Sequence, residues 1–278
     1  MLSYLHGFHA GNFADVHKHY ILCCMLEALT RKDKPFCYLE THSGRAIYDF
    51  KDAQAQKTLE FEQGVSRFFP VPPNGCDQID NYLNTVAAFN QGRLEQYPGS
   101  PCIAQHFARD ADKLMLMELH PTEAKVLKQK FFRDKRVAVH NRDGYEGVTS
   151  LLPPKPNRGM VLIDPSYEDK SEYDQVVDFL KKSLKQWSNG SYAIWYPLLE
   201  ANRWKSMKHK LQRSGIRNIL CSEIEINPSD AGGMYGSGML LINPPWPLEQ
   251  KLTEVMPWLS GQLAQGCSEN RLTWLVPE

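Results

Sequence analysis

From Lys113 onward, short apolar runs alternate with longer amphipathic segments, and this alternation constrains the fold more than any other feature of the sequence. Short apolar runs are typical of buried strands, whereas longer periodic segments are typical of helices. Strands and helices in strict turn predict an α/β fold, a parallel sheet with helices on both faces. The expected strands are 36–40, 113–118, 136–140, 160–163, 192–196, 218–226 and 238–242. The expected helices are 13–32, 121–132, 172–187, 198–213 and 248–265.

The alternation is interrupted between Ala46 and Tyr97. Helical stretches at 56–68 and 77–89 are separated by three prolines, Pro70, Pro72 and Pro73. We interpret 46–97 as a helical insertion in a Rossmann-like domain formed by 1–45 and 98–278. At its end, Ser100 is expected to be the N-cap of a helix with Pro101 in the first position, and capping alone would explain that serine.

Composition fits a globular protein without assigning it a partner. Apolar residues make up 42% of the 278 residues, and 32 basic side chains balance 32 acidic ones. No apolar run is long enough to span a bilayer. The seven cysteines include no Cys-x-x-Cys pair, so neither a disulfide framework nor a zinc site is expected. We therefore expect the protein to work in a reducing cytoplasm.

The run Met160 to Ile163 ends in Asp164-Pro165-Ser166-Tyr167. Ligands of open α/β sheets bind beyond the carboxyl ends of the strands, so Asp164 and Tyr167 are expected to face a site. Asp164 and the Pro165 carbonyl would accept hydrogen bonds from an exocyclic amine, and Tyr167 would stack on the base that carries it. Methyl transfer to an adenine amine therefore leads the hypotheses. An ordinary Asp-Pro turn is the alternative.

Acids also end or follow three other expected strands: Glu40, Glu118 and Asp143. In a nucleoside-binding sheet, Glu118 would accept from ribose hydroxyls, and Asp143-Gly144 would meet the adenine. Gly44 follows the first strand without a second glycine, and no phosphate-binding loop with Lys-Ser/Thr is present. The sequence thus predicts S-adenosylmethionine rather than a triphosphate. Taken singly, each of these acids is more often a helix-capping or solvated residue than a ligand-binding one.

The N-terminal arm and first helix contain His6, His9, His17 and His19. A metal site is not expected, because helical positions two apart point about 200° away from each other. Scattered surface histidines, or a ligand-binding role for one or two of them, are the remaining interpretations.

Asn243-Pro244-Pro245-Trp246 competes with Asp164 for the amine-binding role. It also follows an apolar strand, but that strand is the last one expected in the chain. The earlier strands are those whose ends we assign to the cofactor. We therefore favour Asp164. The alternative for Asn243 to Trp246 is a loop ordered by two prolines and a buried tryptophan.

The opening, from Leu2 through the His6–Asn12 stretch to Lys18-His19, resembles the RlmJ family of 23S ribosomal RNA adenine-N6 methyltransferases. The resemblance extends over the chain through Lys32–Phe36, Thr41-His42, Tyr97–Pro101 and the Asp164 tetrapeptide. It implies a Rossmann-like, S-adenosylmethionine-dependent enzyme that modifies a single adenine. Ser166, where the family usually has a second proline, and the missing second glycine depart from the pattern.

The resemblance also implies roles for particular residues. Asp164 would be catalytic, Tyr4 would meet the RNA, and His6 and Lys18 would support it. The cofactor contacts would be His19, His42, Ser100, Glu118, Asp143, Gly144 and Asp164.

The RNA partner would present its adenine flipped out or in a single strand. Lys18, Arg45 and the N-terminal arm are expected to hold RNA phosphates. A DNA adenine-N6 methyltransferase is the runner-up, because the amine chemistry is the same. A protein that binds nucleic acid or nucleoside without catalysis is the third hypothesis.

Overall fold

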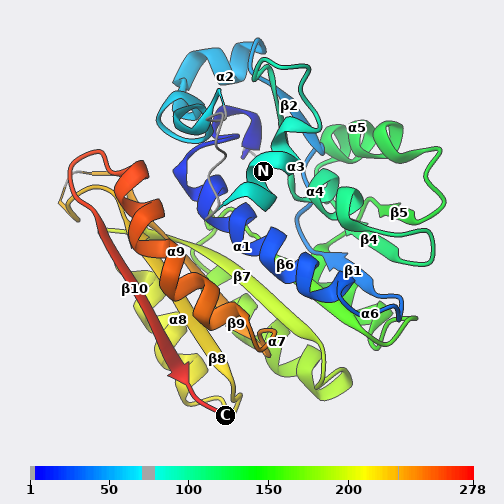
Figure 1. Cartoon of the computed structure of the whole chain (residues 1–278). Helices are drawn as coiled ribbons and strands as arrows, with labels where there is room; N and C mark the ends of the chain where they lie inside the picture. The colour runs from blue at the N-terminus through cyan, green and yellow to red at the C-terminus, as the bar shows by residue number, and fades with distance from the viewer. Residues whose placement is uncertain (1–3, 71–78, 231) are drawn as a thin grey trace.

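An eight-stranded sheet is the centre of the computed structural model, which describes residues 4–70, 79–230 and 232–278 (Figure 1). The strand order is β10-β8-β9-β7-β6-β1-β4-β5. Five neighbouring strands are parallel: β1 (Cys37–Glu40), β4 (Lys113–Met117), β5 (Val137–His140), β6 (Gly159–Ile163) and β7 (Ser191–Leu199). The other three are β8 (Ile219–Glu225), β9 (Met234–Ile242) and β10 (Glu269–Val276).

The expectation of an entirely parallel sheet is wrong for these last strands. β9 is antiparallel to both β7 and β8, and β10 is antiparallel to β8. A parallel connection needs a crossover of about a dozen residues or more, and the segment between β8 and β9 is shorter than that. The chain therefore turns back directly. The strand β10, in the stretch after the last expected helix, was not anticipated.

The reversal of β9 settles where the rival tetrapeptide lies. Ile242 at the end of β9 pairs with Tyr192 at the beginning of β7, so Asn243 is at the edge opposite to the carboxyl ends of the parallel strands. Its amide donates to the carbonyls of Ser188 and Gly190, both at 2.9 Å. Trp246 is 94% exposed, so the expectation of a buried tryptophan is wrong.

Both faces of the sheet are covered, as expected for an α/β fold. Alternate residues of a strand point to opposite faces, and Tyr38 lies in one core while Cys37 and Leu39 lie in the other. The Tyr38 core is covered by α1 (Phe13–Thr30), α3 (Asp80–Ala87), α4 (Ser100–Phe107), α5 (Pro121–Phe131) and α9 (Leu248–Leu263). The other core is covered by α6 (Gly144–Leu151), α7 (Glu172–Gln186) and α8 (Arg203–Gln212).

The helix α1 lies across the middle of the sheet (Figure 1) and is buried along most of its length, from Phe13 to Leu26. The Asn12 side chain accepts from the backbone N–H groups of Ala14 and Asp15 at 3.0 Å, which confirms the expected cap. His17 and His19 are 0% and 1% exposed, so the surface interpretation is wrong for both. The ring nitrogens of His17 contact the hydroxyls of Ser237 at 3.0 Å and Ser222 at 3.1 Å, which ties α1 to β9 and β8.

Residues 46–97 contain more than the expected helices. The helices are α2 (Ala53–Thr58), η2 (Glu60–Gln63), η3 (Val65–Phe68) and α3, after the short η1 (His6–Phe8) in the N-terminal arm. Two short strands, β2 (Ile47–Asp49) and β3 (Gln96–Pro98), pair antiparallel at the ends of the segment. Pro72 and Pro73 lie outside the described residues.

The expected cap at Ser100 is wrong. Helix α4 begins at Ser100 itself, and Gly99 is its N-cap. The Ser100 side chain is directed instead at the Glu40 carboxylate at the end of β1. Its role is therefore to join α4 to the sheet.

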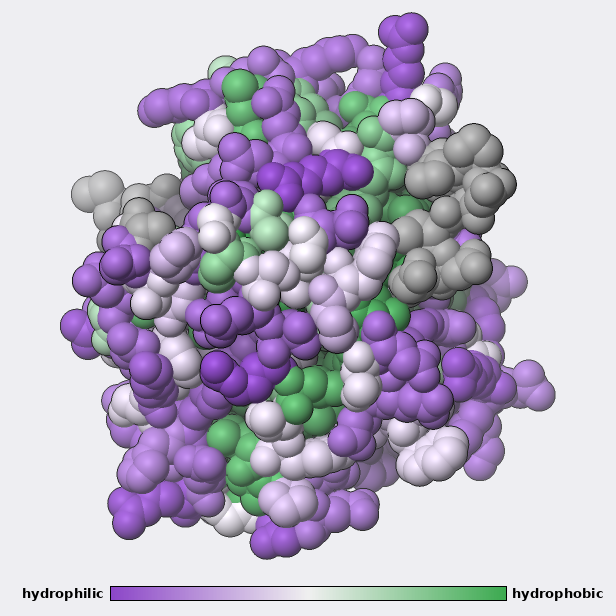
Figure 2. Space-filling model, turned by 60° about the vertical axis from the view of Figure 1, so that its left-hand side comes forward, coloured by the Kyte–Doolittle hydropathy of each residue, from purple (hydrophilic) through white to green (hydrophobic). Residues whose placement is uncertain are grey.

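Hydrophilic residues cover most of the face in Figure 2, and hydrophobic residues reach the surface there only in smaller areas. None of the described helices is both long enough and apolar enough to cross a membrane.

Gly159 at the beginning of β6 allows a close approach between strands. A Cβ there would lie 1.7 Å from the Cys37 carbonyl oxygen, and its φ is +152°. We expect Gly159→Ala to lower the free energy of unfolding by about 3 kcal/mol or more, because neither backbone can move aside. Gly215→Ala is the matched control: its φ is +81°, but a Cβ would meet nothing within 4 Å. Its cost should stay near 1–2 kcal/mol, about that of left-handed strain alone. If urea denaturation showed equal losses of unfolding free energy for Gly159→Ala and Gly215→Ala, this account would be contradicted.

Candidate functional site

The carboxyl ends of the parallel strands meet at one edge of the sheet and gather the acids expected from the sequence. Glu40 ends β1, Glu118 follows β4, Asp143 lies three residues after β5, and Asp164 follows β6. Helix α1 passes close to this edge, because the Lys18 ammonium lies 2.5 Å from the Asp164 carboxylate. The edge therefore combines acids from four strands with a cation from the first helix.

A continuous series of polar contacts connects the N-terminal arm to Asp164. The Tyr4 hydroxyl is 2.9 Å from His6 Nδ1, and His6 Nε2 is 2.9 Å from Asp15 Oδ2. The other Asp15 oxygen lies 2.9 Å from Lys18 Nζ, which contacts Asp164 in turn. We call Tyr4, His6, Asp15, Lys18 and Asp164 the N-terminal relay. Asp15 also accepts from the Gly11 backbone N–H at 2.8 Å, which holds the arm against α1.

The charged groups of the N-terminal relay are buried and pair with one another. The side chains of Asp15 and Lys18 are 1% and 5% exposed. Burial alone would raise the pKa of Asp15, but His6 and Lys18 outweigh it and hold that pKa well below its ordinary value. Burial alone would lower the pKa of Lys18, but Asp15 and Asp164 outweigh it and raise that pKa above its ordinary value. Both groups are therefore charged at neutral pH.

Three buried polar atoms near this edge have no hydrogen-bond partner within the described residues: His19 Nε2, Glu40 Oε2 and Ser43 Oγ. The other polar atoms of two of these side chains are engaged. His19 Nδ1 lies 2.8 Å from the Tyr97 hydroxyl, and Ser100 donates to Glu40 Oε1. Unsatisfied buried polar atoms are costly, so each of these three is a candidate contact for a polar ligand.

Burial also sets the protonation of this group. It lowers the pKa of His19 to about 3 and raises the pKa of Glu40 to about 8. At neutral pH the imidazole is neutral and the Glu40 carboxyl is largely protonated. A ligand there would meet a neutral ring and a neutral acid rather than two charges.

Glu118 and Asp143 both contact backbone N–H groups. Glu118 accepts from Gly44 and His120, each at 2.7 Å, and burial raises the pKa of its carboxyl. Asp143 is the N-cap of α6 and accepts from Glu146 N–H at 2.8 Å. Capping therefore accounts for one oxygen of Asp143 and leaves room for the expected role.

Gly144 and His42 adjoin the loop after β1. A Cβ on Gly144 would lie 1.9 Å from the Thr41 carbonyl oxygen, so only glycine lets α6 approach this loop so closely. His42 Nδ1 lies 2.8 Å from the Thr41 hydroxyl, and burial lowers the pKa of His42 to about 4. In the same loop Ala46, where a second glycine was expected, has a φ of +78°. The turn thus keeps a left-handed backbone with an alanine.

The stacking role expected of Tyr167 is wrong for this structure. Its side chain is 2% exposed, and its ring centroid lies 4.4 Å from that of Tyr173. Its hydroxyl donates to the Trp195 carbonyl at 2.8 Å. The ring is a core side chain and presents no face to a base. Pro165 is buried beside Asp164.

Two of the expected phosphate contacts are also wrong. Lys18 is buried between two carboxylates, as described above. Arg45 binds Glu123 through two hydrogen bonds of 2.8 and 2.7 Å. Their charges are already neutralised inside the protein, so neither is available to an RNA phosphate.

Asp15 belongs to the N-terminal relay, and the sequence analysis gave it no role. Its spacing offered a signal, because Asp15 precedes Lys18 by three positions and His19 by four, on one side of the same helix. An acid in the first turn of a helix is usually explained by the helix dipole, which concealed its role.

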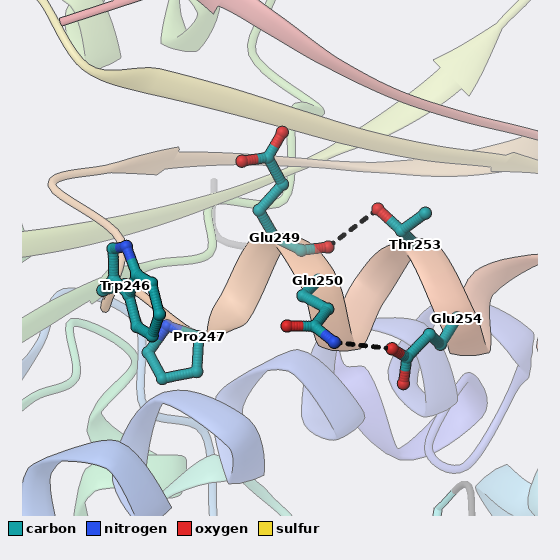
Figure 3. A pocket seen from close by; sticks show the side chains of 6 residues that line it. All are labelled: Trp246, Pro247, Glu249, Gln250, Thr253 and Glu254. Carbon is teal, nitrogen blue, oxygen red and sulfur yellow. Dashed lines mark hydrogen bonds between the residues drawn. The ribbon is translucent and has the colours of Figure 1, made fainter.

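A second hollow lies away from this edge. Figure 3 shows a hollow at the beginning of α9, lined by Trp246, Pro247, Glu249, Gln250, Thr253 and Glu254. It follows β9 and shares no residue with the edge described above. Within the described ranges, no three His, Cys, Asp or Glu side chains are grouped to hold a metal ion.

Comparisons with known proteins agree with this picture. A family model described as Ribosomal RNA large subunit methyltransferase D, RlmJ, matches residues 33–276. The Ribosomal RNA large subunit methyltransferase J proteins of Escherichia coli and Haemophilus influenzae are 43% and 42% identical to the chain, each alignment covering 100% of both sequences. A crystal structure of a Legionella pneumophila protein is 36% identical, covers 96% of this chain and 98% of its own, and has a TM-score of 0.89.

Glu40 makes stability depend on pH in a predictable direction. A carboxyl whose folded pKa is raised, here to about 8, stabilises the fold at low pH, and that contribution is lost as pH rises towards the folded value. Between pH 5 and 9 we expect wild-type stability to fall relative to Glu40→Gln by at most on the order of 4 kcal/mol. Urea denaturation at several pH values measures the difference. The exposed Glu62→Gln should show no such trend, and parallel curves for wild type and Glu40→Gln would refute the assignment.

Proposed function

The chain belongs to the RlmJ family of ribosomal RNA large subunit methyltransferases, and on that premise we propose that it methylates N6 of a single adenine in 23S ribosomal RNA. S-adenosylmethionine would be the methyl donor, and the reaction would take place in the cytoplasm. We also propose that 46–97 acts as an insertion subdomain of the Rossmann-like domain 1–45 and 98–278.

The observation that carries this proposal is the contact of Lys18 with Asp164 at the carboxyl end of β6. The Lys18 ammonium donates to one oxygen of the Asp164 carboxylate and so holds this side chain in place at the end of the strand. An ionised carboxylate is the acceptor that an exocyclic amine needs when it becomes positively charged. The chemistry thus requires the residue pair that the fold has brought together.

The donor groups at this edge fit the proposed cofactor. The unpartnered atoms of His19, Glu40 and Ser43 suit the polar amino-acid end of S-adenosylmethionine, with Ser100 and His42 beside them. Glu118 would accept from the ribose hydroxyls, and Asp143-Gly144 would contact the adenine. When bound, S-adenosylmethionine supplies a methyl group on a positively charged sulfur.

Asp164 would contribute to catalysis mainly by orienting the adenine amine. The adenine amine is a weak nucleophile, because its lone pair is delocalised into the ring. Asp164 and the Pro165 carbonyl would accept its two N–H groups and align the nitrogen lone pair with the methyl group. Alignment can supply up to about 7–11 kcal/mol of the barrier. Oriented acceptors of the developing charge contribute roughly 3 kcal/mol more. Asp164 would then accept the proton.

Since Tyr167 is buried, we assign the stacking role to Tyr4. Its ring lies 5.7 Å from that of His9 and nearly parallel to it, at 11°. His9 is hydrogen-bonded at 2.8 Å to Glu60 in η2, so the arm is fixed at both ends of this aromatic pair. The relay would orient the Tyr4 ring through its hydroxyl.

DNA adenine methylation and binding without catalysis remain the competing functions. Methyl-transfer assays with fragments of 23S ribosomal RNA and with duplex DNA separate the first from the proposal. Calorimetry with S-adenosylmethionine, followed by turnover measurements, separates the second. Mass-spectrometric mapping of methyladenine in ribosomal RNA from cells lacking the gene would identify the nucleotide.

Substitution of Asp164 tests the catalytic assignment. We expect Asp164→Ala and Asp164→Asn to lower kcat by at least about 10²–10³-fold, because the acceptor for the amine is lost. The affinity for S-adenosylmethionine should stay within a few-fold of wild type. The asparagine variant keeps the side-chain volume and controls for packing. RNA methylation at the wild-type rate by either variant would reject the assignment.

Tyr4 gives a graded prediction. Tyr4→Phe keeps the ring and should retain most turnover, whereas Tyr4→Ala should weaken use of the RNA by about 10-fold or more, in line with the loss of one stacked base. Tyr167→Phe, which alters only a buried hydroxyl, is the comparison variant. Kinetics with saturating cofactor and varied RNA measure the effects. Similar losses for Tyr4→Ala and Tyr4→Phe would show that the hydroxyl, not the ring, is what matters.

A further inference from the structure

The outer side of α5 carries positive charge that is not balanced locally, although the whole chain has 32 basic and 32 acidic residues. Five cations on this helix and just beyond it are exposed, and an exposed phenylalanine lies among them. We name this surface the α5 basic face: Lys125, Lys128, Lys130, Phe132, Arg133 and Lys135.

In the part of the chain that the structure describes, none of these five cations forms an ion pair with a carboxylate. Their neighbours differ in this respect. Arg136 is paired with Asp134 at 2.7 Å. On α8, which is also rich in cations, Lys208 is paired with Glu223 and Lys210 with Asp174. The α5 basic face is therefore an uncompensated source of positive potential.

Phe132 gives the face a second property. Its side chain is 74% exposed, the largest fraction among the exposed large hydrophobic residues that the structure describes, except that of Trp246. The Arg133 guanidinium lies 5.0 Å from the centre of its ring. Lys125, Lys128 and Phe132 recur at intervals of three and four, so they share one side of the helix, whereas Lys130 points about 200° away from Lys128. A flat ring beside cations offers both stacking and phosphate contacts.

Helix α5 begins near the edge that gathers Glu40, Glu118, Asp143 and Asp164, where we propose that methyl transfer takes place. The helix begins three residues after Glu118 and runs back beside the sheet. At about 1.5 Å per residue, its 11 residues extend roughly 16 Å. Where it ends, Lys130, Arg133, Lys135 and Arg136 line a shallow hollow with Gln105, Asp110 and Asp134.

We propose that the α5 basic face is a second RNA-binding surface, which holds phosphates and stacks one base away from the target adenine. The inference rests on the proposed function and adds a place where the same RNA is anchored. Lys18 and Arg45 are engaged with carboxylates inside the protein, so the phosphates need other partners. A polyanion that also carries flat rings is the occupant that matches both properties of the face.

The test compares two sets of lysines on different helices. Lys125→Gln, Lys128→Gln and Lys130→Gln are combined in one variant, and Phe132→Ala is made separately. The control combines Lys181→Gln, Lys182→Gln and Lys185→Gln on the exposed side of α7. The probes are a long 23S ribosomal RNA transcript and a short adenine-containing oligonucleotide, each titrated at several salt concentrations.

We expect the α5 triple variant to bind the transcript about 10-fold more weakly at 0.1 M salt. Its slope of log affinity against log salt should be smaller by about 2, as loss of three phosphate contacts implies. Phe132→Ala should weaken binding by about 10-fold with an unchanged slope. KM for the transcript should rise while kcat, use of the short oligonucleotide and cofactor affinity stay at wild-type values. The α7 control should behave as wild type.

Three results would overturn the proposal. One is transcript binding by the α5 variants with wild-type affinity and salt slope. Another is an equal loss in the α7 control, which would show a diffuse effect of total charge. The third is a change of oligomeric state in Phe132→Ala without loss of RNA affinity, which would assign the face to a second copy of the chain. Binding is measured separately from turnover, so absence of methyl transfer in the wild type would reject the proposed function and leave this test intact.

Discussion

The candidate site depends on one buried group of three charges, in which Lys18 pairs with both Asp15 and Asp164. Each partner alone would be an uncompensated charge in a dry core, which costs several kcal/mol as a rule. Together they fix the first helix against the end of β6, and through His6 they fix the N-terminal arm. A buried ion pair is poor evidence of stability by itself, because well-packed apolar side chains are often as good. Its value here is positional: it holds a carboxylate and an aromatic ring at the edge where four strands end.

Much of the sheet was predictable, because buried parallel strands are short, apolar and separated by helices with clear caps. The presence of β1, β4, β5, β6 and β7 follows from that pattern, and so does the gathering of Glu40, Glu118, Asp143 and Asp164 at one edge, whereas the order of the strands across the sheet was not predicted. The reversal of β9 was not predictable from periodicity, since a strand has the same pattern in either direction. Contacts between distant residues were also hidden. Nothing local to Ser100 shows that its hydroxyl is used by Glu40 rather than by its own helix.

Helix α1 shows why polar composition misleads when burial is inferred from sequence. A helix with an acid, a lysine and two histidines in two turns looks like a solvated face, yet these side chains are almost completely buried. The lysine and the two histidines have partners from far along the chain, whereas the partners of Asp15 lie within nine residues of it. The opposite error concerned Tyr167, where an aromatic residue in a functional motif is a packing residue. The motif identified the right strand end. Only the contacts in the structure show that the Asp164 carboxylate lies at the edge and that the Tyr167 ring packs in the core.

The long-range partners of α1 have a consequence for how the protein acquires its structure. The histidine at position 17 meets its two serine partners only after 205 and 220 further residues have been added to the chain. During synthesis on the ribosome, α1 therefore lacks these two partners until nearly the last strands have emerged. High sequence separation of contacts slows folding and prolongs exposure of unfinished surfaces. The edge that gathers the four acids would thus receive its covering helix late in the folding of the chain.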